Sequence, residues 1–414
     1  MGKIRPRATI ISWILYDFGM AWFSMIVITA YFILYFKEVV VGGDKGHGDF
    51  LWGIAVSTAM LLSVLLSPLL GAVADLRGKK KTFLTAAAGL SIISTILLYF
   101  TGPNQVFPAM LLVVTGYTGY TIAMTFYNAF LPEIADAESI EKLSGIGWGL
   151  GYVGGLTALL CMVFMVPSVA DGKPIVLLTG VMFAVFALPA FVILKDSPNP
   201  ARIEGASIKD GFRRIRATFR EIRSFRTVFI FLLGYFFVSD AMSTIIVFFS
   251  SYTVHTLHFS VRQNVMLLMI IQLSAAAGSV ATGFIAKRIG ALQTVILTIV
   301  VWIGALLGIF AFSSTSVFYG LSVVAGLVLG GTQATARSFM ARESPAEKQA
   351  EFFGFMTFGS KVAAILGPLL YGLISQQTNN PRLAILSLEL FFIAGLIIML
   401  KVPRKSPSSH MIPS

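Results

Sequence analysis

The stretch Gly71-Ala-Val-Ala-Asp75-Leu-Arg77-Gly78-Lys-Lys-Lys81 separates two long apolar runs of the sequence. Its charged side chains are too polar for a bilayer core, so the stretch must lie at a membrane surface, and its excess of Lys and Arg indicates the cytoplasmic one. The two glycines allow a tight turn and a close approach of neighbouring helices. This stretch therefore predicts two membrane-spanning helices joined by a short turn.

The turn has a second copy in the other half of the chain. Gly283-Phe-Ile-Ala-Lys-Arg-Ile-Gly290 contains Gly, Ala, Arg and Gly in the same order, and its glycines lie 212 positions after those of the first copy in a chain of 414 residues. Glu133 and Glu343, each close to a proline after an apolar run, are 210 positions apart. Two such matches at half the chain length predict an internal duplication.

Composition indicates a polytopic membrane protein. The chain is 56% hydrophobic and 12% charged, whereas soluble proteins contain about 25% charged residues. A helical span needs about 20 mostly apolar residues, and a membrane β-barrel would instead show alternating segments of about ten. The sequence predicts an all-α protein with twelve spans in two six-helix repeats, at about 10–36, 51–74, 82–101, 107–131, 144–166, 175–194, 227–254, 264–286, 291–312, 316–342, 352–375 and 383–401.

The distribution of positive charge predicts the topology. With the N-terminus inside, 24 of the 31 Lys and Arg residues fall in cytoplasmic segments and 5 fall outside. This asymmetry predicts a multi-pass protein of the cell (inner) membrane with both termini cytoplasmic. It also accounts for the net charge of +12 without a nucleic-acid partner.

The halves are expected at 1–194 and 227–401, followed by a cytoplasmic tail at 402–414. The linker between them, 195–226, contains a basic amphipathic pattern that predicts a helix lying on anionic inner-leaflet lipids. A monomer is expected.

Ionisable residues inside spans are costly and are therefore candidates for function. They are Asp17, Asp240, Arg337, Lys361 and Glu389. Lys361 is expected near the midplane, facing a watery cavity in which it binds an anionic group; the alternative is an ion pair with Asp17 or Asp240. Either aspartate could bind an ammonium group, carry a coupling proton, or stay charged beside a cation. Arg337 could contact the ligand or join an inner gate, and Glu389 is left without a role.

Polar and aromatic neighbours complete the candidate site. The expected substrate-binding residues are Lys361, Asp17, Asp240, Gln333, Arg337, Asn128, Tyr127, Trp13 and Tyr16. The expected gating residues are Asp75, Arg77, Gly71, Gly78, Glu133 and Glu343.

The sequence contains no motif that indicates an enzyme, a metal site or a cofactor. Gly149-Leu-Gly151-Tyr-Val-Gly154 matches the dinucleotide-binding pattern, but it lies in a hydrophobic span and follows no strand. We interpret its glycines as small residues that allow close helix contact.

Twelve spans, the duplication, the long inner linker and the Gly71–Lys81 turn together resemble the major facilitator superfamily. This resemblance implies that Asp75 latches onto the inner end of the eleventh span and favours the outward-facing state, where a carboxylate meets the positive end of a helix. The second copy has Lys287 in place of Asp75. The equivalent latch onto the fifth span is therefore expected to be absent.

Within that superfamily, the chain resembles bacterial relatives of the fungal vacuolar (autophagy-related) amino-acid effluxers. The most specific match is Leu143–Gly155. Further matches are Tyr16–Phe18, Leu131–Ala135, Asp240, Gly331–Gln333, Arg337–Ser338, Phe352–Gly354 and Ser360–Lys361. The family usually follows the first Asp-Phe with a small polar run, whereas this chain has Gly19-Met-Ala-Trp22, which suggests a less polar substrate.

These observations predict a secondary active transporter that works by alternating access. Coupling of transport to a proton is left open. Charges of both signs suit a zwitterion, and the resemblance implies amino acids. One alternative is an exporter of larger apolar or anionic compounds, favoured by the 35 phenylalanines. A second is a non-transporting membrane receptor or scaffold that uses the basic linker.

Overall fold

The computed structural model describes residues 7–43, 45–134, 140–196, 223, 225–312, 314–344 and 349–403. In this part of the chain, eleven helical spans are long and apolar enough to cross a membrane, and the shorter apolar stretch Gly149–Met165 supplies a twelfth. The predicted all-α membrane fold is therefore confirmed. The expected linker helix and the end of the tail lie outside the described residues.

The twelve spans follow the predicted order. The amino-terminal half contains α1 (Arg7–Trp22) continued by η1 (Phe23–Ala30), α2 (Phe32–Tyr35) and η2 (Phe36–Val40), then α3 (Lys45–Arg77), α4 (Lys80–Leu98), α5 (Val106–Ile134), α6 (Ile140–Met165) and α7 (Pro174–Ile193). The carboxyl-terminal half contains α9 (Arg226–Ser251) continued by η3 (Tyr252–Thr256), α10 (Val261–Ile289), α11 (Ala291–Ala311), α12 (Thr315–Glu343), α13 (Gln349–Ala363), α14 (Leu366–Thr378), α15 (Pro381–Ser387) and α16 (Glu389–Leu400).

Three spans are less regular than the sequence predicts. The first span contains the π-helical segments η1 and η2, and the twelfth is divided between α15 and α16. The eleventh, expected at about 352–375, spans Phe352–Thr378 and is divided between α13 and α14. Pro368 explains this break, because its ring clashes with the carbonyl four residues earlier, at Ala364.

Both copies of the glycine turn contain a glycine with positive φ. Gly78 lies between α3 and α4 with φ +60°, and Gly290 lies between α10 and α11 with φ +92°. Positive φ favours glycine because it has no Cβ. The structure thus confirms the duplicated turn; the side chains of Asp75 and Arg77 lie outside the described residues, so the latch stays a prediction.

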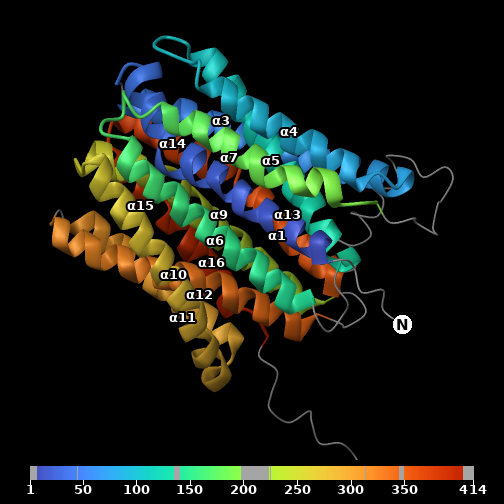
Figure 1. Cartoon of the computed structure of the whole chain (residues 1–414). Helices are drawn as coiled ribbons and strands as arrows, with labels where there is room; N and C mark the ends of the chain where they lie inside the picture. The colour runs from blue at the N-terminus through green and yellow to red at the C-terminus, as the bar shows by residue number, and fades with distance from the viewer. Residues whose placement is uncertain are drawn as a thin grey trace, which may run out of the picture.

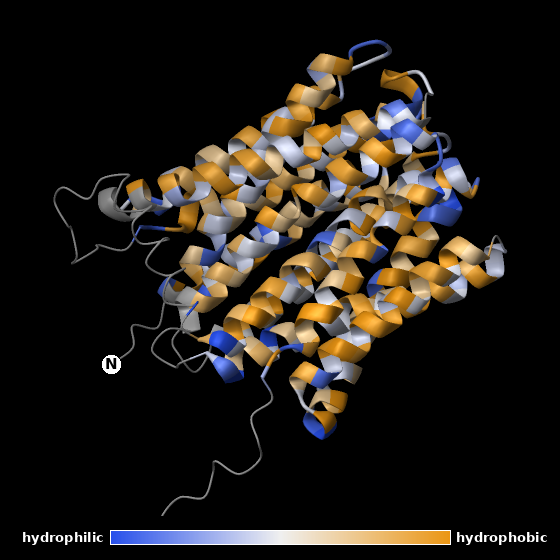
Figure 2. Cartoon of the chain, turned by 180° about the vertical axis from the view of Figure 1, so that it is seen from behind, coloured by the Kyte–Doolittle hydropathy of each residue, from blue (hydrophilic) through white to orange (hydrophobic). Residues whose placement is uncertain are grey.

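The two six-helix halves lie side by side along the bundle (Figure 1). Contacts between halves are made mainly by α3 with α14 and by α6 with α10. Figure 2 shows hydrophobic residues along the lengths of the helices and hydrophilic residues gathered near their ends. We call the end of the bundle where α1 begins and α3, α5 and α12 terminate the basic end. The opposite end, where η2, η3 and α14 terminate, is the far end.

Close packing of α10 on α12 depends on glycine, which gives a testable prediction. A Cβ on Gly278 would collide with the backbone carbonyl of Leu327. Gly278→Ala is therefore expected to destabilise the protein by about 1–3 kcal/mol through overpacking, measured by thermal unfolding in detergent. The control is Gly283→Ala on the same helix, where a Cβ meets open space and better helix propensity contributes up to about 1 kcal/mol. Equal effects of the two changes would contradict this account.

Candidate functional site

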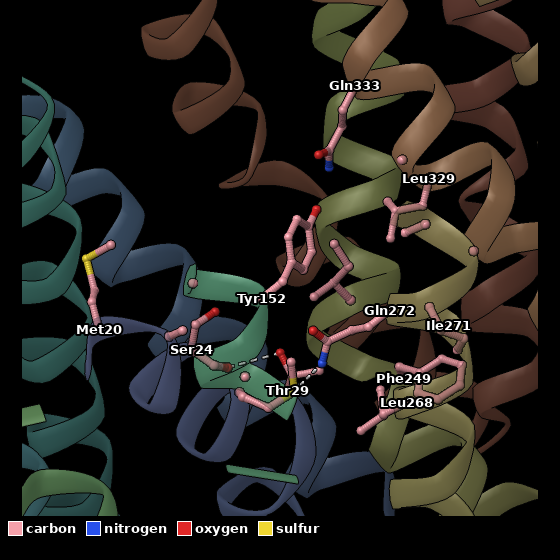
Figure 3. Close-up of a pocket in the computed structure, with 18 of the residues that line it drawn as sticks. Met20, Ser24, Thr29, Tyr152, Phe249, Leu268, Ile271, Gln272, Leu329 and Gln333 are labelled. Atoms are coloured by element: carbon pink, nitrogen blue, oxygen red, sulfur yellow. Dashed lines mark hydrogen bonds between the residues drawn. The ribbon is translucent and has the colours of Figure 1, made fainter. Parts of the chain in front are cut away.

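A cavity of about 380 Å³ lies between the two halves. Its lining comes from α1, η1, α5 and α6 of the amino-terminal half and from α9, α10, α11 and α12 of the other. Figure 3 shows side chains from both halves converging on it. The position matches the central site expected between two repeats.

Asp17 is the charged side chain among the described residues that line this cavity. Its carboxylate lies against Gly151 of α6, where a Cβ would sit 3.2 Å from Oδ2. A Cβ on Gly154 would collide with the backbone of Phe18, so the interpretation as small contact residues is confirmed for Gly151 and Gly154, whereas a Cβ on Gly149 would meet open space. The structure records no hydrogen-bonding partner for the Asp17 carboxylate among the described side chains. The carboxylate is therefore available to a ligand cation.

Amide side chains face the cavity from three helices. Asn128 of α5, Gln272 of α10 and Gln333 of α12 line it, and Figure 3 shows the two glutamines pointing toward its interior. A primary amide can donate to a carboxylate or accept from an ammonium group. Sequence reasoning missed Gln272, although a glutamine near the middle of the run 264–286 was a visible signal.

The remaining walls are largely apolar. Met20, Met25 and Met124 line the cavity together with Phe249 and Leu329. Methionine side chains adapt their shape to different apolar groups. The site thus combines one carboxylate and several amides with walls that suit an apolar moiety.

Tyr127 lines the cavity in front of an aromatic stack. Its ring lies 4.4 Å from the Trp13 ring and 5.1 Å from the Tyr16 ring, measured between centroids. Trp13 Nε1 donates a hydrogen bond of 3.0 Å to the Tyr127 carbonyl. Trp13 and Tyr16 are buried outside the cavity lining. They can support Tyr127, whereas a direct contact with a ligand is not open to them in this state.

Lys361 lies outside the lining of the central cavity. Its Nζ donates to Thr125 Oγ1 at 2.9 Å and to the Thr121 carbonyl at 3.3 Å, both on α5. Neither Asp17 nor Asp240 accepts a hydrogen bond from it among the described residues. Lys361 therefore joins α13 to the other half, and neither of the two expected arrangements is observed.

Asp240 also lies away from the central cavity, fully buried on α9. Its Oδ1 accepts a hydrogen bond of 2.9 Å from the backbone N–H of Gly367. Ser57 Oγ, from the other half, donates to the Ile365 carbonyl at 2.7 Å. Side chains of α9 and α3 thus satisfy backbone groups left open where the eleventh span is broken.

The other two ionisable residues in spans have different surroundings. Arg337 is exposed on α12, where its Nε lies 3.4 Å from the Gln333 carbonyl and its charge interacts with the Tyr152 phenol. It lies on the basic-end side of the cavity residue Gln333. Glu389 is 5% exposed, and neither carboxylate oxygen has a partner among the described residues.

A buried polar network, which we call the far-end network, joins the two halves opposite the basic end. It consists of Lys37, Asp49, Ser251 and Ser375. Lys37 Nζ pairs with Asp49 Oδ1 at 2.5 Å and donates to Ser251 Oγ at 2.6 Å, while Ser375 Oγ donates to Asp49 Oδ2 at 2.8 Å. Lys37 is 1% exposed and Asp49 0%. Sequence reasoning counted Lys37 only as an outer charge and missed this network.

Exposed residues lie between the cavity and the basic end. Asn128, Gly149 and Arg337 are exposed on the α5, α6 and α12 segments that lead from the cavity to that end. At the far end, the corresponding segments of the first and seventh spans are buried, including Tyr31, Phe32 and Tyr252. The described structure is therefore closed at the far end.

Residues 50–409 match the family model described as "Vacuole effluxer Atg22 like". The chain belongs to this family. Among its relatives, the "Uncharacterized MFS-type transporter YxiO" of Bacillus subtilis is 28% identical over 406 residues, covering 95% of both chains. "Autophagy-related protein 22" of Eremothecium gossypii is 26% identical, over 84% of this chain and 75% of that one.

Solved structures show the same fold for this Atg22-like chain. The nucleoside transporter NupG superposes with a TM-score of 0.71 at 13% identity, covering 97% of this chain and 98% of that one. A bacterial homologue of the human lysosomal transporter Spinster, in an inward-facing and occupied conformation, gives 0.71 at 14% identity, with 97% and 98% covered. These likenesses establish the major facilitator fold.

The structure places four of the expected gating residues of this Atg22-like chain, Glu133, Gly78, Gly71 and Glu343. Glu133 pairs with Lys80 at 2.7 Å and so joins α5 to α4 within one half. Gly78 forms the turn after α3, Gly71 lies inside that helix, and Glu343 ends α12. The Lys80–Glu133 pair gives no cross-half gate by itself, and the side chains of Asp75 and Arg77 lie outside the described part of the structure.

Proposed function

We propose that the chain is a secondary active transporter that moves a small zwitterionic solute, best represented by amino acids with apolar side chains, by alternating access. The observation that carries this proposal is the central cavity, lined from both halves, with Asp17 as its charged residue. Asp17 binds the ammonium group, and the amides of Gln272 and Gln333 bind the carboxylate. Met20 and Met25 contact the apolar side chain.

The proposed orientation places the basic end in the cytoplasm of a cell whose inner membrane holds the protein, with both termini inside. The described structure then corresponds to an inward-facing state, because its far end is closed. Asp75 would act as the latch for the opposite state, and Asp17 is a candidate for the coupling proton as well as for the ammonium group. The transporter is proposed to act as a monomer.

A second candidate is an exporter of larger apolar compounds. The predominantly apolar walls of the cavity and its methionines favour it. Such a compound would not need the Asp17 carboxylate, so its transport should survive removal of that charge.

The test is counterflow in proteoliposomes that contain the purified full chain. Labelled L-leucine represents an apolar side chain, and L-lysine and L-glutamate carry additional charges of either sign. We expect counterflow of leucine, with little for the other two, because a second charge would enter an apolar cavity without a partner. A response to an inward-acid gradient would support proton coupling. No counterflow for leucine or any other amino acid tested would contradict the proposed substrate, and transport of an amphiphile instead would support the second candidate.

A further inference from the structure

A second cavity, of about 200 Å³, lies between α9 and α13 and shares no lining residue with the central one. Most of its lining is apolar, from Phe229 to Phe236 on α9 and from Phe355 to Val362 on α13. Leu233, which belongs to this lining, is 44% exposed. In a protein that crosses a bilayer, an exposed leucine on a spanning helix indicates contact with lipid. We call this cavity the α9–α13 pocket.

Two cationic side chains lie at the basic-end edge of the α9–α13 pocket. Arg226 begins α9 and precedes the pocket residue Phe229 by three residues, which is about 4.5 Å along a helix. Arg223 lies just before it, and both arginines are exposed. Neither has a side-chain partner recorded among the described residues. The edge-to-face contact of Phe225 with Phe352, 5.4 Å between ring centroids, joins this segment to α13.

The same edge suits an anion for a second reason. The first N–H groups of α9, a helix of 26 residues, have no intrahelical acceptor. They also carry the positive end of the helix dipole. An anionic group beside Arg226 would therefore meet two guanidinium groups and free backbone donors, directly next to an apolar pocket.

We propose that an anionic phospholipid binds at this place, with its phosphate between Arg223 and Arg226 and one acyl chain in the α9–α13 pocket. A free phosphate would account for the arginines but leave the apolar pocket unexplained. A lipid chain beside a cationic edge satisfies both features.

The bound lipid is expected to fix the position of α13, the first part of the broken eleventh span. The pocket extends to Val362, close to the point where α13 ends at Ala363. A chain in the pocket packs α13 against α9 and so holds α13 in the position from which Lys361 bonds to α5. Lipid binding is thus expected to favour the state described here.

The test compares two glycines of α13. Gly359 lines the pocket and Gly354 does not, and a Cβ would meet open space at both. The full chain in detergent is titrated with dioleoyl phosphatidylglycerol, and the unfolding temperature and the number of bound lipids, from native mass spectrometry, are recorded. We expect the lipid to raise the unfolding temperature of the wild type and of Gly354→Leu, whereas Gly359→Leu fills the pocket and loses the response.

The head group is tested separately, in case Gly359→Leu folds poorly. Replacing Arg226 and Arg223 with glutamine should weaken the apparent affinity for phosphatidylglycerol about fivefold for each arginine. Phosphatidylcholine, whose choline offsets the charge of its phosphate, should lose less affinity than phosphatidylglycerol. A full response of Gly359→Leu would overturn the proposal, as would a shift reproduced by inorganic phosphate alone or affinity unchanged in the arginine variant. Each readout is independent of solute transport, so the proposed function can fail while this site stands.

Discussion

Asp49→Ala is expected to destabilise the protein by about 3–5 kcal/mol, because it removes the buried carboxylate that pairs with the Lys37 ammonium. Lys37 and Asp49 are both buried, and Asp49 also accepts hydrogen bonds from Ser251 and Ser375 of the other half. Unfolding with heat or denaturant in detergent measures the loss. The change should also loosen the far end, since the two serines lose their common acceptor.

Two controls separate this effect from a general loss of charge. Glu133→Gln removes one partner of the Lys80–Glu133 pair, whose side chains are 26% and 17% exposed, and it is expected to cost about 1 kcal/mol or less. The double change Lys37→Met with Asp49→Leu should recover much of the stability, because apolar residues of similar volume often replace a buried pair at little cost. An Asp49→Ala protein as stable as Glu133→Gln would contradict this account.

Asp17→Asn is expected to weaken binding of the transported solute roughly 10- to 150-fold, the equivalent of about 1.5–3 kcal/mol for a hydrogen bond to a charged group. The physical reason is that the ammonium group of the solute loses its carboxylate partner in a largely apolar cavity. Protection of the purified protein against heat by the solute that gives counterflow measures the change. The substitution conserves shape, so the protein itself should remain folded.

Lys361→Met is the matched control, since it also removes a charge from a span. Lys361 contacts Thr125 and lies outside the cavity lining, so binding should change by less than about fivefold, which is about 1 kcal/mol. Equal losses in the two variants would show that Lys361 reaches the solute in another state. Binding that is insensitive to Asp17→Asn would remove the proposed ammonium site and favour an apolar substrate.

The twelve spans could be predicted because about twenty consecutive apolar residues leave little choice but a membrane helix. The duplicated turn could also be predicted, because the glycines that it needs at positive φ, Gly78 and Gly290, are visible in the sequence. The broken eleventh span was not predicted as such. Its open backbone groups are satisfied by Asp240 and Ser57, and these partners are distant in sequence.

The site was predictable in part, and the misses have physical causes. Asp17, Asn128, Tyr127 and Gln333 line the central cavity, although their contact with a solute stays a prediction. The sequence places Lys361 near the midplane of the membrane, but depth does not determine which neighbour a side chain faces.

The far-end network was missed for a related reason. Its ion pair spans only 12 positions, but Ser251 and Ser375 join it from the other half of the chain, more than 200 positions away, and a single sequence carries no signal for such a pairing.

The bond from Ser57 to the Ile365 carbonyl has a kinetic consequence. It crosses between halves, so opening of the far end must break it, and in an apolar environment an unpaired carbonyl costs several kcal/mol. If water or another donor replaces the serine once the far end is open, the carbonyl is unpaired only during opening. The cost then raises the barrier to opening and leaves the energies of the closed and open states unchanged. Ser57 would then determine how long the far end stays closed. It would lower the turnover number without contacting the transported molecule.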